Sequence, residues 1–180
     1  KFEADMVKWN LSIEEPAALD DVKDGYRRLD KSVGEFMELL ASKGVESHEV
    51  NVKPVNVRRE YDKDGLKGYT LYQSLYVVSS KMEGLEALAL NPLEMAERDI
   101  MVQDSRLEYF YSKIDDLKKD IISKVLENTD VKLGKLLSVR TGVFQITEPY
   151  STEVSSYGIY DTASRKKEIS VTVHAVFALK

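Results

Sequence analysis

The sequence predicts an α+β domain with helices packed on a mixed, largely antiparallel sheet. Alternating apolar and polar residues indicate half-buried strands, and apolar residues at three- and four-residue steps indicate amphipathic helices. Several strands follow one another through short turns, which favours antiparallel neighbours. The order is that of two β-α-β-β units, at about 1–80 and 100–180, joined by a helix at about 81–98. We expect the 180 residues to form a single domain.

The first strand is expected at residues 5–13, where apolar and polar residues alternate. Pro16 is expected in the first turn of the following helix, because its missing N–H costs nothing there. That helix carries one apolar stripe and ends at Gly44, which tolerates a left-handed cap. The stripe consists of Val22, Tyr26, Leu29, Val33, Phe36, Met37 and Leu40. We expect Trp9 of the strand and Phe36 of the stripe to lie in the core.

A second strand is expected at residues 50–61, where the parity of the apolar residues changes at Pro54. Because proline cannot donate to a strand ladder, this change predicts an edge position or a bulge. The basic run at 58–59 also fits an edge, where charges prevent unwanted pairing. We interpret the basic run at 165–167 in the same way.

The strand expected at residues 69–78 has apolar residues on both faces. Leu71 and Leu75 lie on one face, and Tyr72 and Tyr76 lie on the other. A strand that is apolar on both faces is expected to be covered on both, either by helices or by another subunit.

The remaining elements complete the second half of the expected order. A capping-box sequence at 80–83 opens a helix that is interrupted at Asn91-Pro92, where a further short helical turn is expected. A strand follows at about 106–111, with a start nearer Ile100 as the alternative, and then comes a helix with an apolar stripe from 114 to 125. The alternation at 168–179 predicts a final strand.

Residues 131–146, VKLGKLLSVRTGVFQI, form an apolar stretch with two glycines. A phosphate-binding loop requires the order strand, glycine-rich turn and helix, so that N–H groups at the helix start hold the phosphate. Here a helix comes first, so Gly134 is expected in the turn into a strand and Gly142 at a bulge or bend. The stretch is not expected to bind phosphate.

The composition argues against several classes of function. The net charge of −5 argues against a nucleic-acid partner, whose binding requires a basic footprint. The chain has no cysteine, which removes thiolate nucleophiles and thiolate metal ligands. His48 and His174 lack the spacing of a zinc site. We therefore expect no catalytic residue, no metal and no cofactor.

A loop at residues 148–164 contains three tyrosines among several serines. Long loops in compact domains are often functional or mobile, and tyrosines supply broad contact area. A partner or subunit contact and simple disorder both remain open for this loop. The predicted self-association surface combines its tyrosines with those of the strand at 69–78, and consists of Tyr72, Tyr76, Tyr150, Tyr157 and Tyr160.

Five stretches, in this order along the chain, resemble the SIMPL-domain family. They are EADMVKWNLSI, ASKGV, GYTLYQSLYVV, VKLGKLLSVRTGVFQI and KKEISVTVHAVFAL. The similarity covers essentially the whole chain and is greatest to the subgroup in which one N-terminal membrane helix precedes the domain. The interrupted second helix and the tyrosine loop depart from the commoner family pattern.

The resemblance implies a bacterial envelope protein linked with oxidative-stress defence. The family brings no accepted catalytic residues, so the resemblance implies none for this chain. Some members are reported to form large ring-like or channel-like oligomers, which agrees with a strand that is apolar on both faces. We also expect a hydrophobic anchor or signal upstream of Lys1, through which alone the protein would contact a membrane.

The leading hypothesis is a non-enzymatic, periplasm-facing envelope protein that acts as an oligomeric scaffold or interaction module. Its expected partners are further copies of the same chain and an envelope protein. The alternative is a small-ligand-binding protein or an enzyme, with a pocket between the sheet and the helices. A third hypothesis is a soluble, chaperone-like stress protein.

Overall fold

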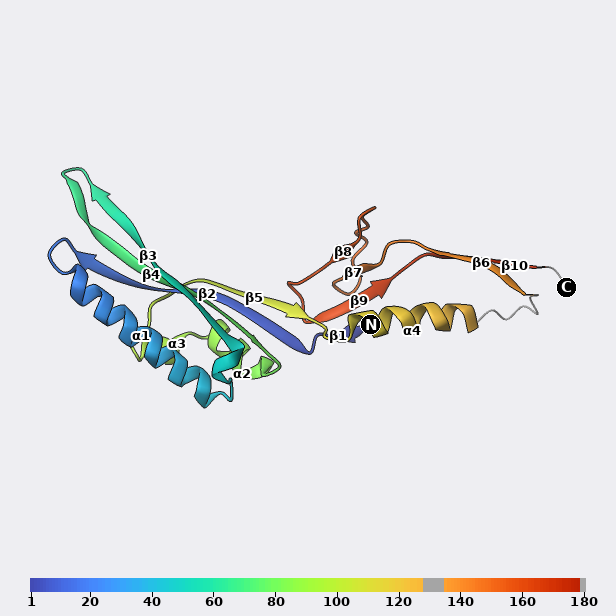
Figure 1. Cartoon of the computed structure of the whole chain (residues 1–180), viewed down its shortest axis with the longest axis horizontal. Helices are drawn as coiled ribbons and strands as arrows, with labels where there is room; N and C mark the ends of the chain where they lie inside the picture. Colours follow the sequence, from blue (N-terminus) through green and yellow to red (C-terminus); the bar gives the residue numbers. More distant parts are fainter. Residues whose placement is uncertain (128–134, 179–180) are drawn as a thin grey trace. The chain divides into compact units, whose positions relative to one another are not determined.

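The computed structural model describes residues 1–127 and 135–178, and confirms the α+β class (Figure 1). The chain divides into two compact units, Met6–Glu108 and Lys1–Asp5 with Tyr109–Lys180. The predicted halves, 1–80 and 100–180, do not coincide with these units. The helices between those halves pack on the sheet of the first unit, so this unit extends well beyond residue 80.

The unit Met6–Glu108 is built on a four-stranded sheet in the order β3-β4-β2-β5. The strands are β2 (Met6–Ala18), β3 (Val50–Asp62), β4 (Gly65–Ser79) and β5 (Val102–Phe110). The helices are α1 (Val22–Ser42), α2 (Met82–Leu90) and α3 (Leu93–Ala96), with a short 3-10 helix η1 (Ser47–Glu49) before β3. Figure 1 shows α1, α2 and α3 on the same side of the sheet.

The core of this unit lies between β2, β4 and the helices. Trp9 and Phe36 are both completely buried, which confirms the prediction for the first strand and the first helix. Gly44 follows α1 with a φ of +82°, as expected for a left-handed residue after a helix end. The other large, fully buried side chains of this unit are Ile13, Leu29, Leu39, Leu40, Leu71, Leu75, Leu85, Leu88 and Met95.

The prediction that Pro16 opens the helix is wrong, because β2 continues to Ala18. The reason lies in the pairing of β2. The Glu14 N–H donates to the carbonyl of Met101, which precedes β5, and Pro16 is the next residue whose nitrogen faces that side. The sheet order places no strand beyond this point on that edge of β2, so the missing N–H of Pro16 breaks no ladder.

The predicted change of phase at Pro54 is confirmed as a bulge in β3. The register with β4 shifts between Val52 and Val55. Val52 lies opposite Leu75 and Val57 lies opposite Leu71, so the valines on either side of the bulge all face the helices. β3 is also an edge strand, as the basic run at 58–59 predicts.

The capping box predicted at 80–83 is not formed. The residue before α2 is Lys81, which forms no side-chain cap hydrogen bond. Its backbone N–H donates to the hydroxyl oxygen of Ser79 at 3.0 Å. The short helix after Asn91-Pro92 is present as α3.

The second unit contains a helix, a small sheet and a separate two-stranded ribbon. The helix is α4 (Ile114–Glu127). The small sheet has the order β1-β9-β7-β8, formed by β1 (Phe2–Glu3), β9 (Lys166–Ser170), β7 (Gln145–Thr147) and β8 (Ile159–Tyr160). The ribbon pairs β6 (Leu136–Thr141) with β10 (Val173–Phe177) in antiparallel orientation.

The final strand predicted at 168–179 is broken into β9 and β10, so that prediction is wrong in its continuity. The break faces a second break between β6 and β7, where the chain leaves the ribbon for the small sheet. The Gly142 N–H donates to the carbonyl of Thr172 at 2.8 Å and joins the two breaks. The bend expected at Gly142 is therefore present, whereas Gly134 lies outside the described residues.

Candidate interaction surfaces

Tyr72 and Tyr76 lie on the face of β4 that points away from α1, and both are half-buried. Leu71, Leu75 and Val77 on the other face are buried beneath the helices. The described helices therefore cover only one face of β4 (Figure 1). The expectation that helices or another subunit cover both faces is met on that face alone.

The open face around these tyrosines is polar, because the neighbouring strand supplies polar side chains there. Asn10 lies opposite Tyr76, and Glu14 lies opposite Tyr72. The hydroxyl groups of Ser12 and Ser74 are 2.9 Å apart between them. The face therefore has two aromatic rings in a hydrogen-bonded polar surface, which differs from the apolar face that β4 alone suggests.

The charges on this open face are mutually paired. Arg58 lies 2.9 Å from Glu60 and 3.8 Å from Glu14. Hydrogen bonds from Thr70 and then from Arg58 hold the pKa of Glu60 below its ordinary value. Such a paired surface offers little net attraction to a ligand of either sign.

The tyrosines of the loop at 148–164 belong to the other unit. Tyr157 is 94% exposed, and Tyr150, also exposed, has the Lys1 ammonium 3.8 Å from its ring centroid. Tyr160 instead stacks on Phe110, with 6.2 Å between ring centroids. Because the five tyrosines are divided between two units, the single self-association surface stays a prediction.

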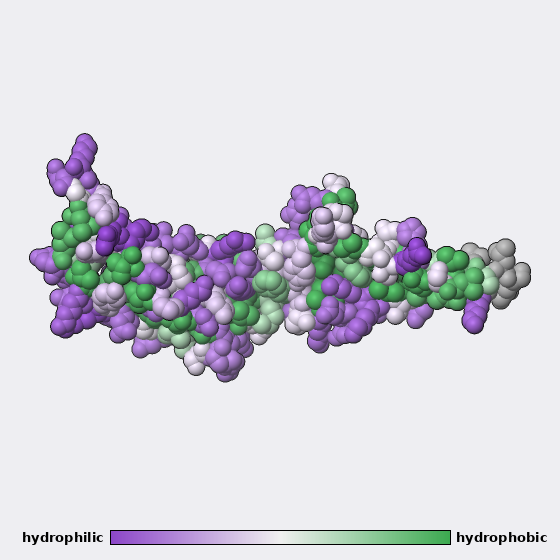
Figure 2. Space-filling view, turned by 45° about the horizontal axis from the view of Figure 1, so that its top comes forward, coloured by the Kyte–Doolittle hydropathy of each residue, from purple (hydrophilic) through white to green (hydrophobic). Residues whose placement is uncertain are grey.

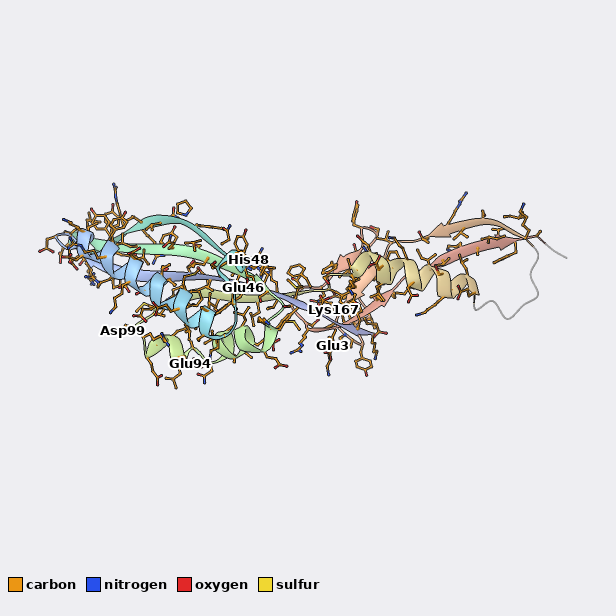
Figure 3. All side chains as sticks on the ribbon, turned by 60° about the horizontal axis from the view of Figure 1, so that its bottom comes forward. Glu3, Glu46, His48, Glu94, Asp99 and Lys167 are labelled. Atoms are coloured by element: carbon orange, nitrogen blue, oxygen red, sulfur yellow. The ribbon has the colours of Figure 1, made fainter. Side chains whose placement is uncertain are left out.

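Lys167, labelled in Figure 3, has an exposed fraction of 0% and holds the end of this loop. Its ammonium group donates to the backbone carbonyl of Asp161 and lies 3.5 Å from the Asp161 carboxylate. The interpretation of residues 165–167 as an edge-protecting run is wrong for Lys167, because β9 lies between β1 and β7. The sequence holds a signal for this, since Lys167 has the same parity as the apolar residues Ile169 and Val171.

The environment of this pair shifts both ionisable groups. Burial lowers the pKa of Lys167, although the charge of Asp161 acts in the opposite direction. Burial acts to raise the pKa of Asp161, but the Ser164 hydroxyl, the Ala163 N–H and the Lys167 charge together hold it below its ordinary value. Asp161 also accepts the N–H of Ser164 and so orders the end of the loop.

Apolar side chains of the second unit are exposed on α4 and on the β6–β10 ribbon, and green areas lie on this part of the chain in Figure 2. Among the described residues of these three elements, none is buried. Leu137 is 63% exposed and Val176 is 52% exposed. In β2 of the other unit, by contrast, the alternating apolar side chains are fully buried. We call the surface formed by α4, β6 and β10 the α4–ribbon surface.

The two histidines lie in different units. His48 is exposed and lies 3.2 Å from a carboxylate oxygen of Glu46, and His174 is exposed on β10 (Figure 3 labels the first pair). Within residues 1–127 and 135–178, no group of three or more His, Asp or Glu side chains is placed to hold a metal ion.

Comparison with known proteins identifies the family of the chain. The family model described as "SIMPL: Protein of unknown function (DUF541)" matches residues 1–177. No curated protein matches the chain. Over the part of the chain that the structure describes, no helix has both the length and the apolar character needed to cross a membrane. The chain belongs to the SIMPL (DUF541) family.

Proposed function

We propose that the protein is a non-enzymatic component of the bacterial cell envelope that faces the periplasm and acts as a homo-oligomeric scaffold or interaction module. The envelope location and the link with stress defence are supported by the likeness to SIMPL proteins. Self-association is supported by the α4–ribbon surface. That surface is the single observation that carries the proposal.

The layer formed by α4 and the β6–β10 ribbon is too thin to be stable by itself. A two-stranded ribbon is marginally stable in water unless it packs against other elements. α4 contacts β10, but no side chain of α4 reaches full burial. Burying one Val or Leu side chain stabilises a protein by about 1.5–3 kcal/mol. Covering the exposed apolar side chains of this surface would therefore stabilise the protein considerably.

A second copy of the chain is the occupant that best fits this surface. The ribbon has two strands, and each has its outer edge unpaired among the described residues. Two copies related by a two-fold axis would present the same apolar residues and the same open strand edges to each other. A stable contact of this kind buries about 800 Å² on each partner.

The exposed tyrosines of the loop at 148–164 supply a second contact for an envelope partner. Tyrosine combines a large apolar ring with a polar tip, and it is enriched at protein interfaces. Tyr150 and Tyr157 expose most of their surface, whereas the base of the loop is fixed by Lys167 and Asp161.

The proposal is tested by placing a charge on the α4–ribbon surface. Leu137→Glu and Val176→Glu should each lower the solution mass measured by light scattering, because a carboxylate opposes burial against an apolar partner. Leu90→Glu is the matched control, since Leu90 is 80% exposed on α2 in the other unit. A parent oligomer that both ribbon variants leave unchanged would contradict the proposed interface.

A further inference from the structure

The unit Met6–Glu108 contains a cleft where the end of β2 meets α1 and the segment after α3. It consists of two adjoining depressions of about 570 Å³ and 290 Å³, both lined by Glu15 and Asp99. The larger depression is mainly apolar and includes Pro16, Ile100 and Met101. The smaller one is charged, and lies between α1 and the residues that follow α3.

Most charges in the smaller depression neutralise one another. Arg28 lies 3.7 Å from Glu15, and Arg98 lies 3.5 Å from Glu35. Glu15 also accepts a hydrogen bond from the buried Ser32 hydroxyl at 2.8 Å. These contacts hold the walls of the cleft in place.

Lys31 and Asp99 also line the smaller depression and are not used in this way. In the described part of the chain, neither side chain lies within 4 Å of an oppositely charged group. Together with the paired residues, they give the depression three positive and three negative side chains. The site thus has no net preference for an anion or a cation, but it offers one unpaired charge of each sign.

The backbone at Asp99 gives an independent reason to assign a role to this carboxylate. Asp99 has a φ of +57°, the left-handed region where glycine is the usual residue after a helix (Figure 3 shows its position beside α3). Two hydrogen bonds impose this conformation, from the Asp99 N–H to Ala96 and from the Ile100 N–H to Met95. An aspartate at such a position carries backbone strain that glycine would relieve, and strained residues concentrate at functional sites.

We infer that this cleft binds a small zwitterion, of the class of a free amino acid with an apolar side chain. The ligand carboxylate would lie against Lys31 and its ammonium group against Asp99. The apolar side chain would occupy the larger depression, beside Ile100 and Met101. A few convergent polar groups beside an apolar hollow are the usual composition of a small-molecule site. This inference does not depend on self-association, since every residue of the cleft belongs to one unit of one chain.

The experiment titrates the whole chain with L-leucine, 4-methylpentanoate and 3-methylbutylamine and follows backbone amide shifts by NMR. The second compound lacks the ammonium group and the third lacks the carboxylate. We expect L-leucine to shift the amides of residues 31–35 and 98–101, and each analogue to bind at least about tenfold more weakly. No saturable shift up to about 10 mM L-leucine, or equal binding of either analogue, overturns the inference.

Matched variants locate the binding. Lys31→Met and Asp99→Asn should each weaken L-leucine binding at least about fivefold, since each removes one of the two free charges. Asparagine tolerates the left-handed backbone, so the second variant should fold. Lys23→Met and Asp30→Asn are the controls, because both residues lie on α1 but do not line the cleft. L-leucine binding that survives both test variants places the site elsewhere and overturns the assignment.

Discussion

The rings of Trp9 and Phe36 pack edge to face at the centre of the Met6–Glu108 unit, with 5.6 Å between their centroids and 66° between their planes. The indole N–H of Trp9 also donates to the hydroxyl of Ser105 on β5 at 2.9 Å. The contact thereby joins β2, α1 and β5. Because Trp9 is the only tryptophan in the chain, its fluorescence reports the unfolding of this unit.

Phe36→Ala should lower the free energy of unfolding of this unit by about 3–5 kcal/mol, because it removes a fully buried ring and leaves a cavity. Urea denaturation followed by Trp9 fluorescence measures the change. Tyr26→Ala on the same helix is the control, since Tyr26 is exposed. An unchanged urea midpoint for Phe36→Ala would show that the pair is not in a tightly packed core.

Two glycines of the same unit should respond in opposite directions to alanine. A Cβ on Gly68 would lie 2.6 Å from the carbonyl oxygen of Ala17, a backbone atom that cannot move alone, so Gly68→Ala should cost about 1–3 kcal/mol. A Cβ on Gly34 within α1 meets no atom within 4 Å, so Gly34→Ala should add about 0.5–1 kcal/mol. The same denaturation assay tests both, and equal effects of the two substitutions would contradict the described packing of β2 on β4.

Acid should loosen the end of the tyrosine loop through Asp161. A carboxyl group whose pKa is lower in the folded chain stabilises the fold above its unfolded pKa, which is about 3.9. That stabilisation is lost as the pH falls through the lower, folded pKa. In the parent, amide hydrogen exchange at Ala163 and Ser164 should therefore accelerate below about pH 4 relative to the exchange expected for a free peptide.

Asp161→Asn should remove most of this pH dependence, because no carboxylate remains to be protonated there. The control is Glu153→Gln, which changes an exposed carboxyl group in the same loop. If the parent and Asp161→Asn lose protection with the same pH profile, then Asp161 does not hold the loop.

Local patterns in the sequence predict much of the first unit. The stripe from Leu29 to Leu40 predicts α1, and the phase change at Pro54 predicts the bulge that keeps the valines of β3 on the helix side. These features depend on residues close together in the sequence, where the period of two or 3.6 has a direct geometric meaning. The same reasoning does not predict the position of Pro16, because that depends on where the distant strand β5 begins.

The second unit is predicted less well, for an equally physical reason. The alternation from 168 to 179 predicts an extended chain, but it does not predict which sheet each part joins. It therefore does not predict the break opposite Gly142, where the chain passes from the small sheet (β9) to the ribbon (β10). Lys167 is buried because β9 lies inside a sheet. Its residue type alone argues against burial, since lysine is almost never fully buried unless it is paired. That Lys31 and Asp99 line the same depression cannot be predicted from the sequence, because 67 residues separate them along the chain and only the fold places them in one cleft.

We expect a second copy of the chain to cover the α4–ribbon surface. Light scattering on the parent protein, from low to high micromolar concentration, tests this most directly. We predict a mass that is a multiple of 20.5 kDa over the upper part of this range. A mass of 20.5 kDa at every concentration would contradict it, and would require the apolar side chains of α4, β6 and β10 to remain in water.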